Sequence, residues 1–182
     1  VLGTSIPYSN NAKLSTKGFE LTVSWRDHIT SDLSYNVAFS LGDSRSTILK
    51  YKNDSGRIDD WYEGKKVGEI WGFVTDGIIQ SEGEPMPDQS KYYNTWGPGD
   101  MKYKDLDGNN ILDDGARTLN DHGDLKVIGN HTPRFNYGIT AGLTWKDFDF
   151  NMFWQGIGKR DYLANVSLNR FYGVVIGGTP GS

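Results

Sequence analysis

Four short runs of the sequence alternate between apolar and polar residues, and this alternation constrains the fold more than any other feature. The first two runs cover residues 19–25 and 33–41, and the last two cover 135–145 and 148–155. Because successive side chains of a β-strand point to opposite faces, each run predicts a strand with one apolar and one polar face. No stretch shows a convincing helical periodicity, so the sequence predicts an all-β, antiparallel fold.

The apolar positions of these runs are unusually aromatic. Trp25, Trp145 and Trp154 are predicted near strand ends, where aromatic residues of outer-membrane barrels lie at the membrane boundary. The pattern therefore favours a transmembrane antiparallel β-barrel whose apolar face contacts membrane lipid. A secreted β-sandwich that binds carbohydrate or acts as an adhesin is the alternative, and it predicts that the apolar faces meet across a protein core.

Composition narrows the classes of function. The net charge is −4, so the chain lacks the excess of basic residues that nucleic-acid binding needs. The mean hydropathy of −0.57 is compatible with a barrel, because only every second strand residue would contact lipid. The sequence contains no run of about 18 apolar residues, so it predicts no transmembrane helix. The absence of cysteine excludes disulfide frameworks and cysteine nucleophiles.

The connections between the runs alternate between short and long. Residues 26–32, which include His28, are predicted to form one tight turn, and Lys146 and Asp147 another. The second strand is expected to continue to Tyr51, and about eighty residues then precede the third run. Short turns at one end and long loops at the other are typical of outer-membrane barrels. Closure needs at least about eight strands, so we expect the chain to be part of a larger barrel.

Several segments resemble motifs of SusC/RagA-type TonB-linked outer-membrane transporters. The longest is YEGKKVGEIWGFVTDGIIQ at 62–80. The others are KGFEL at 17–21, GPGDMKYKDLDG at 97–108, GDLKVIGN with TPRFNYG at 123–138, and FDFNMFWQG at 148–156. These segments follow the order of the family and span most of the chain.

The resemblance implies that residues 1–182 are part of a barrel domain, with the plug domain and the terminal strand absent from this sequence. It further implies an outer-membrane location in a Gram-negative bacterium and import of oligosaccharides or peptides. The implied partners are a SusD-like surface lipoprotein that closes the top as a lid, and TonB, contacted through parts that this sequence lacks.

An acidic segment in the long connection has the spacing of a calcium-binding loop. Asp105, Asp107, Asn109 and Asp113 occupy positions 1, 3, 5 and 9 of an EF-hand-like loop, and Ile111 offers its carbonyl at position 7. Position 6 is Asn110 rather than glycine, and position 12 is Ala116 rather than a carboxylate; Asp114 or Asp121 is a candidate substitute. A bound Ca²⁺ is therefore one interpretation, and an acidic turn without an ion is the other.

The same connection contains aromatic residues that suit contact with a substrate or partner, namely Trp61, Trp71, Tyr92, Tyr93 and Trp96. Packing of the loop against itself explains them equally well. A glycan-degrading enzyme would need two carboxylates at a defined separation, for which Glu20 and Asp149 are the candidates by position alone. No G-x-S-x-G motif supports a serine nucleophile. We therefore expect no catalytic residues.

Overall fold

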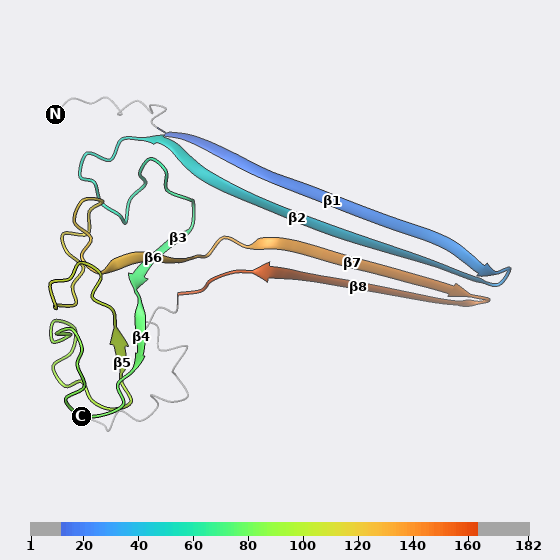
Figure 1. The fold of residues 1–182 in the computed structure, drawn as a ribbon. Coiled ribbons are helices and arrows are strands. Elements are labelled where there is room, and N and C mark those ends of the chain that lie inside the picture. The colour runs from blue at the N-terminus through green and yellow to red at the C-terminus, as the bar shows by residue number, and fades with distance from the viewer. Residues whose placement is uncertain (1–11, 164–182) are drawn as a thin grey trace, which may run out of the picture.

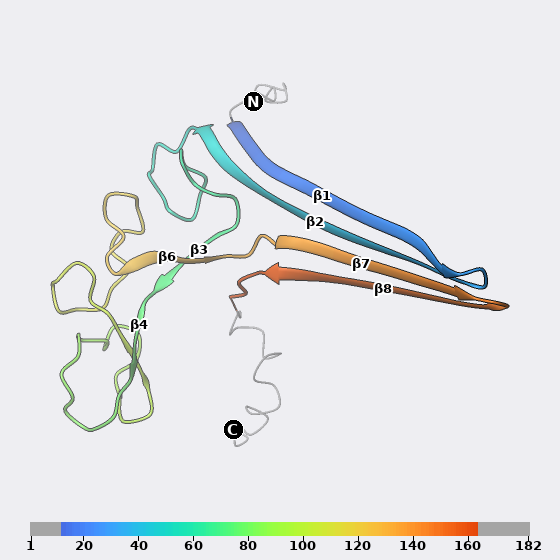
Figure 2. The ribbon, with the colours of Figure 1, turned by 45° about the vertical axis from the view of Figure 1, so that its right-hand side comes forward.

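The main element of the chain is a four-stranded antiparallel sheet. The computed structural model describes residues 12–163. The sheet has the order β1-β2-β7-β8, and its strands are β1 (Ala12–Thr30), β2 (Leu33–Tyr51), β7 (Arg134–Trp145) and β8 (Phe148–Lys159). The four predicted runs are confirmed as strands, and the described residues form an all-β structure with antiparallel sheets. Figures 1 and 2 show a long ribbon of strands with the remaining described chain gathered at one end.

No helix within residues 12–163 has the length and apolar character needed to cross a membrane.

Both short turns lie at the end of the sheet away from the large connection (Figure 1). The second turn is Lys146 and Asp147, as predicted, and Lys146 has the positive φ of 54° that a two-residue hairpin of type II′ needs. The Lys146 amide donates to the Asp32 carbonyl at 2.9 Å, which joins the two turns. The predicted arrangement of short turns at one end and a long connection at the other is therefore confirmed.

The first turn is shorter than predicted. It contains only Ser31 and Asp32, because β1 continues to Thr30. His28 therefore lies in β1, where it pairs with Ser34 of β2, and the prediction that it belongs to a turn is wrong. Residues 26–32 are mostly polar, a composition that favours a turn. Pairing with β2 nevertheless keeps the chain extended to Thr30, with one irregularity in register between His28 and Thr30.

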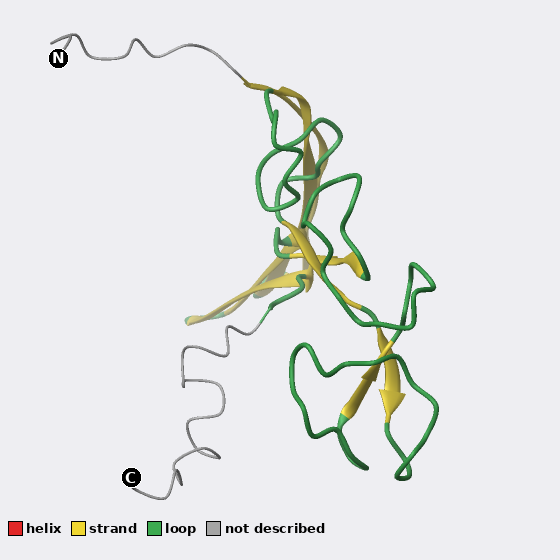
Figure 3. Cartoon of the chain, turned by 90° about the vertical axis from the view of Figure 1, so that its left-hand side faces the viewer, coloured by secondary structure: helices red, strands yellow, loops and turns green. Residues whose placement is uncertain are grey.

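The long connection contains four short strands that the sequence pattern did not predict. Strands β3 (Glu69–Phe73) and β6 (Leu125–Asn130) form one antiparallel pair. Strands β4 (Thr75–Ile78) and β5 (Met101–Tyr103) form another. Figure 3 shows these pairs among extended loops. We call residues 52–133 the loop region.

Among the described residues, the buried apolar side chains gather in and next to the loop region rather than on the sheet. They are Ile48, Ile58, Tyr62, Ile79, Leu112 and Leu125, and only Ile48 comes from a strand of the four-stranded sheet. Backbone hydrogen bonds from Ile48 to Lys65 (2.9 Å) and from Gly64 to Ile48 (2.8 Å) attach the loop region to the end of β2. The long connection is therefore a folded unit with a small core of its own.

Candidate functional site

The register of the sheet places the alternating apolar residues of all four strands on one face. Val23 pairs with Phe39, Phe39 with Ile139, and Ile139 with Trp154. Paired residues of neighbouring antiparallel strands point to the same side, so this row runs across the whole sheet. Rows above and below repeat it from Leu33 to Leu41, a length of nine residues along β2. A membrane-spanning strand needs about 9–11 residues. We call this surface the apolar face.

The apolar face is exposed in the described chain. The exposed fractions of Trp25, Phe150 and Trp154 are 63%, 59% and 64%. In the described part of the chain, no second sheet packs against it, because the other two sheets are the short pairs of the loop region. The meeting of apolar faces that a β-sandwich requires is therefore not observed among residues 12–163. An extended exposed apolar surface marks contact with something outside the described residues.

Only one of the three tryptophans predicted near strand ends lies at such an end. Trp145 is the last residue of β7, and its ring stacks with Phe148 at a centroid distance of 6.3 Å. Trp25 pairs with Val37, well before the end of β1, and Trp154 is in the interior of β8. The prediction for Trp25 and Trp154 is wrong because both strands continue past the runs that the sequence pattern identified.

The opposite face of the sheet is mainly polar. Its polar side chains include Asn36, Asn136, Thr140, Asn151 and Gln155, which the register places on one side. Gly142 lies between Asn36 and Asn151, and a Cβ atom at this position would come within 2.4 Å of the Asn36 Oδ1 atom. The glycine therefore allows two amide side chains to lie side by side across three strands. Phe153 is an aromatic exception on this face, opposite Thr140.

The carboxylates proposed for an enzyme do not face each other. Glu20 lies in β1 near the loop region, whereas Asp149 lies in β8 next to the turn. These strands are the two outer strands of the sheet. The Asp149 Oδ1 atom accepts a hydrogen bond from the Thr144 hydroxyl at 2.7 Å. The sheet thus places the two carboxylates at opposite edges and opposite ends.

The acidic segment folds into a compact loop held by its own side chains. The two carboxylate oxygens of Asp105 accept from the amides of Gly108 (2.6 Å) and Asn110 (2.8 Å). These hydrogen bonds to the charged form lower the pKa of Asp105 below its usual value, with the Asn110 amide as the largest cause. Asn110 itself has a left-handed φ of 62°, the conformation for which the sequence pattern expects glycine.

The structure brings together only part of the predicted ligand set, and it adds a residue that sequence reasoning missed. Carboxylate oxygens of Asp105, Asp107 and Asp124 lie within 4.8 Å of one another. Asp113 is outside this group, and its Oδ1 atom accepts from the Gly115 amide at 2.7 Å. The Asn109 Oδ1 atom accepts from the Ile111 amide at 2.6 Å. Neither Asp114 nor Asp121, the candidate substitutes, belongs to the group.

Asp124 connects the two ends of this loop through hydrogen bonds. Its side chain is fully buried, and its Oδ1 atom accepts from the Leu106 amide at 2.5 Å. Its Oδ2 atom accepts from the Asp113 amide at 2.9 Å. One carboxylate at the start of β6 therefore holds both ends of the acidic segment.

The five predicted contact aromatics divide into packed and exposed residues. Trp71 lies half-buried in β3, 5.4 Å from the His122 ring, and Trp96 donates its indole N–H to the Gln89 carbonyl at 3.0 Å. These two residues serve the packing of the loop region. Tyr93 is 57% exposed, and Trp61 packs on Tyr51 while leaving 38% of its surface exposed.

Tyr92 belongs to a charged cluster that ties separate loops together. Its hydroxyl donates to Asp114 at 3.1 Å, and Lys91 donates to the same Oδ1 atom at 2.6 Å. The Lys91 ammonium is the largest cause that lowers the pKa of Asp114 to about 2. Arg117 joins Asp114 to Asp59, whose carboxylate it contacts at 2.7 and 3.1 Å. The cluster connects residues separated by up to 58 positions in sequence.

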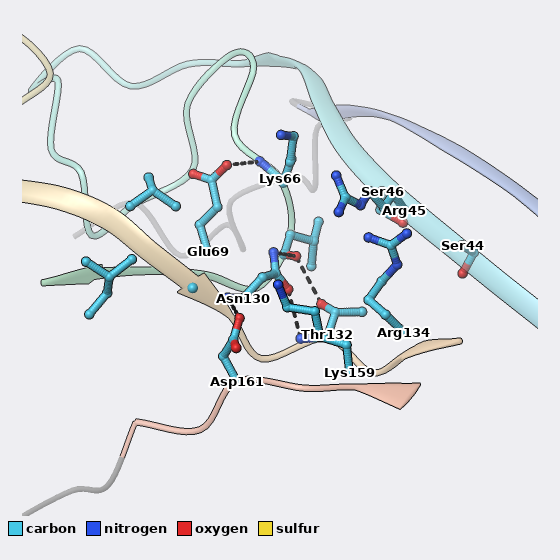
Figure 4. A pocket seen from close by; sticks show the side chains of 14 residues that line it. Ser44, Arg45, Ser46, Lys66, Glu69, Asn130, Thr132, Arg134, Lys159 and Asp161 are labelled. Carbon is cyan, nitrogen blue, oxygen red and sulfur yellow. Dashed lines mark hydrogen bonds between the residues drawn. The ribbon is translucent and has the colours of Figure 1, made fainter. Parts of the chain in front are cut away.

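A pocket of about 350 Å³ lies where the end of the sheet meets the loop region (Figure 4). Its basic lining residues come from three strands and one loop, namely Arg45, Lys66, Arg134 and Lys159. Arg134 forms a bidentate ion pair with Asp43 of β2. Phe135 beside it has a φ of 54°, which interrupts the regular strand at this junction.

Comparison with known proteins finds two similar receptors. No protein-family model matches the chain. TonB-dependent receptor P3 of Formosa agariphila is 25% identical over 166 residues, which cover 84% of this chain and 16% of that receptor. TonB-dependent receptor P26 of the same organism is 23% identical over 181 residues, which cover 93% of this chain and 17% of that receptor. Over most of its length, the chain is similar to TonB-dependent receptors. It spans about a sixth of the length of these two receptors.

Proposed function

We propose that this receptor segment forms part of the wall and the extracellular loops of a transporter in the outer membrane of a Gram-negative bacterium. The observation that carries the proposal is the four-stranded sheet, which has an exposed apolar face, a mainly polar opposite face, short turns at one end and a folded loop region at the other. This combination is the arrangement of a transmembrane barrel wall. Further strands of the same receptor would pair with the free edges of β1 and β8 and close the barrel.

Within this proposal, the two faces of the sheet have different roles. The apolar face contacts lipid, and the polar face, with Asn36, Thr140 and Asn151, lines the lumen. The segment makes and breaks no covalent bond. Energy for import comes from TonB.

The finer assignment is to the SusC/RagA group, in which the substrate is an oligosaccharide or a peptide and a SusD-like lipoprotein covers the top. Its support is the set of sequence motifs that the chain shares with this group. The longest motif, 62–80, forms β3, β4 and the buried residues Tyr62 and Ile79. The motif thus contributes buried residues to the core of the loop region. The aromatic residues Tyr93 and Trp61 remain exposed and contact the lid or the substrate.

The lid contact is tested by replacing one exposed ring. In the full-length receptor, Tyr93→Ala is expected to weaken the affinity for the lipoprotein by about tenfold, because aromatic residues often dominate the binding energy of an interface. Tyr93→Phe keeps the ring and is the matched control, expected to bind as the wild type does. Co-purification of the lipoprotein and growth on the cognate nutrient are measured together with the amount of receptor in the outer membrane. Wild-type affinity in Tyr93→Ala would contradict this assignment of the contact.

We also propose that the acidic loop binds Ca²⁺ in the assembled receptor. The cluster of Asp105, Asp107 and Asp124 supports this, since calcium prefers six to eight oxygen ligands and clustered carboxylates repel each other without a cation. Asp124 supplies a carboxylate to a loop whose position 12 is Ala116. The carbonyl of Ile111 and the side chain of Asn109 are further oxygen donors in the same loop.

Calcium binding is expected to be modest, with a dissociation constant of about 0.1–1 mM, as in extracellular modules. Addition of about 5 mM CaCl₂ to the full-length receptor should then slow amide hydrogen exchange in residues 105–124. Asp107→Ala removes an exposed carboxylate and should abolish this effect, whereas Asp54→Ala, outside the cluster, should retain it. Identical exchange with CaCl₂ and with EGTA would show that the loop is an acidic turn without an ion.

A further inference from the structure

A basic stripe continues the apolar face beyond its last apolar row. Phe19 pairs with Asp43, and two residues further along each strand Lys17 pairs directly with Arg45. A spacing of two residues keeps a side chain on the same face of a strand. Lys17 and Arg45 therefore lie on the side of the sheet that carries the apolar face, in the second row past Leu41 towards the loop region.

A second like-charged pair extends the stripe. Lys13 lies four residues before Lys17 in β1, on the same face, and it pairs with Lys50 across an irregularity in register. All four basic residues are exposed, whereas Ile48, on the opposite face of β2, is completely buried. The basic side chains thus point away from the loop region's core.

These charges form no ion pair within residues 12–163. Asp43 is the nearest carboxylate on this face, and both of its oxygens are held by Arg134. None of the four basic residues forms an ion pair with a described residue. Like charges placed directly opposite each other in a sheet repel, so an anion between Lys17 and Arg45 would relieve this repulsion.

The surface around the pair is shaped to admit such an anion. Lys17, Phe19, Arg45 and Arg134 line one hollow of about 590 Å³, together with Asp43, whose carboxylate is paired with Arg134. Arg45 also borders the pocket next to it, where Figure 4 shows the Arg134 side chain reaching towards β2 beside Arg45. An aromatic ring at the edge of an apolar band and two cations just past it match the order of acyl chain and headgroup in a phospholipid.

We propose that Lys17 and Arg45 bind the phosphate group of a membrane lipid at the loop end of the apolar face. The inference rests on the proposed function, because a lipid headgroup lies at this level only if the apolar face contacts the acyl chains. The recognised chemistry is the phosphate, which a headgroup and free inorganic phosphate share. A lipid differs from the free ion because its acyl chains would also contact the Phe19 ring and the apolar row that begins at Leu21.

The test uses the full-length receptor in detergent micelles and the double variant K17Q/R45Q. Dioleoyl phosphatidic acid is titrated into each sample, and native mass spectrometry measures bound lipid. Each basic residue near an anionic surface contributes about a factor of five, so the double variant should bind phosphatidic acid about 25-fold more weakly. The control K104Q/K126Q removes the same charge from the loop region and should bind as the wild type does. Inorganic phosphate at equal concentration should not compete.

Each outcome decides the inference. Equal affinity in K17Q/R45Q and the wild type, with both receptors present in the outer membrane, overturns it and leaves the barrel proposal in place. Competition by inorganic phosphate at equal concentration overturns the lipid as the source of the phosphate. A wild-type receptor that is absent from the outer-membrane fraction overturns the barrel proposal, and this inference with it.

Discussion

An arginine in place of Ile139 is expected to lower the free energy of unfolding of the full-length receptor in lipid by about 2–4 kcal/mol. Ile139 belongs to a central row of the apolar face, between Phe39 and Trp154. At this depth a charged side chain would have to leave water or reach for the membrane boundary, and the cost of arginine is greatest at the midplane. A chemical-denaturation titration of the receptor in phospholipid vesicles measures the change.

The matched control is the next residue along the same strand. Thr140 points to the opposite face, where a water-filled lumen would solvate a charge. Thr140→Arg should therefore cost about 0.5 kcal/mol or less, as ordinary surface substitutions do. Equal costs at both positions would show that the two faces do not meet different solvents, and the barrel wall would then be the wrong interpretation.

The sheet could be predicted from the sequence because its strands carry a repeating signal. A period of two over five or more residues, as in 33–41, identifies both the strand and its apolar side. Strand ends are less predictable, because register and hydrogen bonding to a neighbour extend a strand through polar residues. Arg26–Thr30 shows this: its composition is typical of a turn, yet pairing with β2 keeps it extended.

The loop region could not be predicted in the same way. Its strands have three to six residues, too few to show a period. Spacing rules correctly indicated that Asp105 and Asp107 lie in one acidic loop, because those residues are close in sequence. Asp124 lies 18 residues from Leu106, and only the fold brings its carboxylate to that amide. Asp124 lies in the segment 123–130 that resembles a family motif, but that resemblance assigns no role to this residue.

Replacing Asp124 is expected to destabilise the acidic loop, because this carboxylate holds both ends of the loop. Asp124→Ala removes the only side-chain acceptor of the Leu106 and Asp113 amides in the described chain and leaves these donors in a part-buried site. Each unsatisfied buried group costs about 1–3 kcal/mol, so the free energy of local opening should fall by about 3 kcal/mol. Hydrogen exchange in residues 105–113 should then accelerate by about a hundredfold in the full-length receptor, measured by mass spectrometry with EGTA present.

Asp107→Ala is the control variant: it also removes a carboxylate charge from the cluster, but it leaves the hydrogen bonds of Asp124 in place. Asp107 is exposed, and among the described residues its carboxylate accepts only from Asn109, two residues away. Without calcium its replacement should change exchange by less than about threefold, since an exposed hydrogen bond contributes little. Exchange in the four sheet strands should be unaltered in both variants, because the sheet is held by its own register. If Asp124→Ala exchanges no faster than Asp107→Ala, the buried carboxylate does not hold the acidic loop together, and the loop must owe its order to the short-range bonds of Asp105 and Asn109.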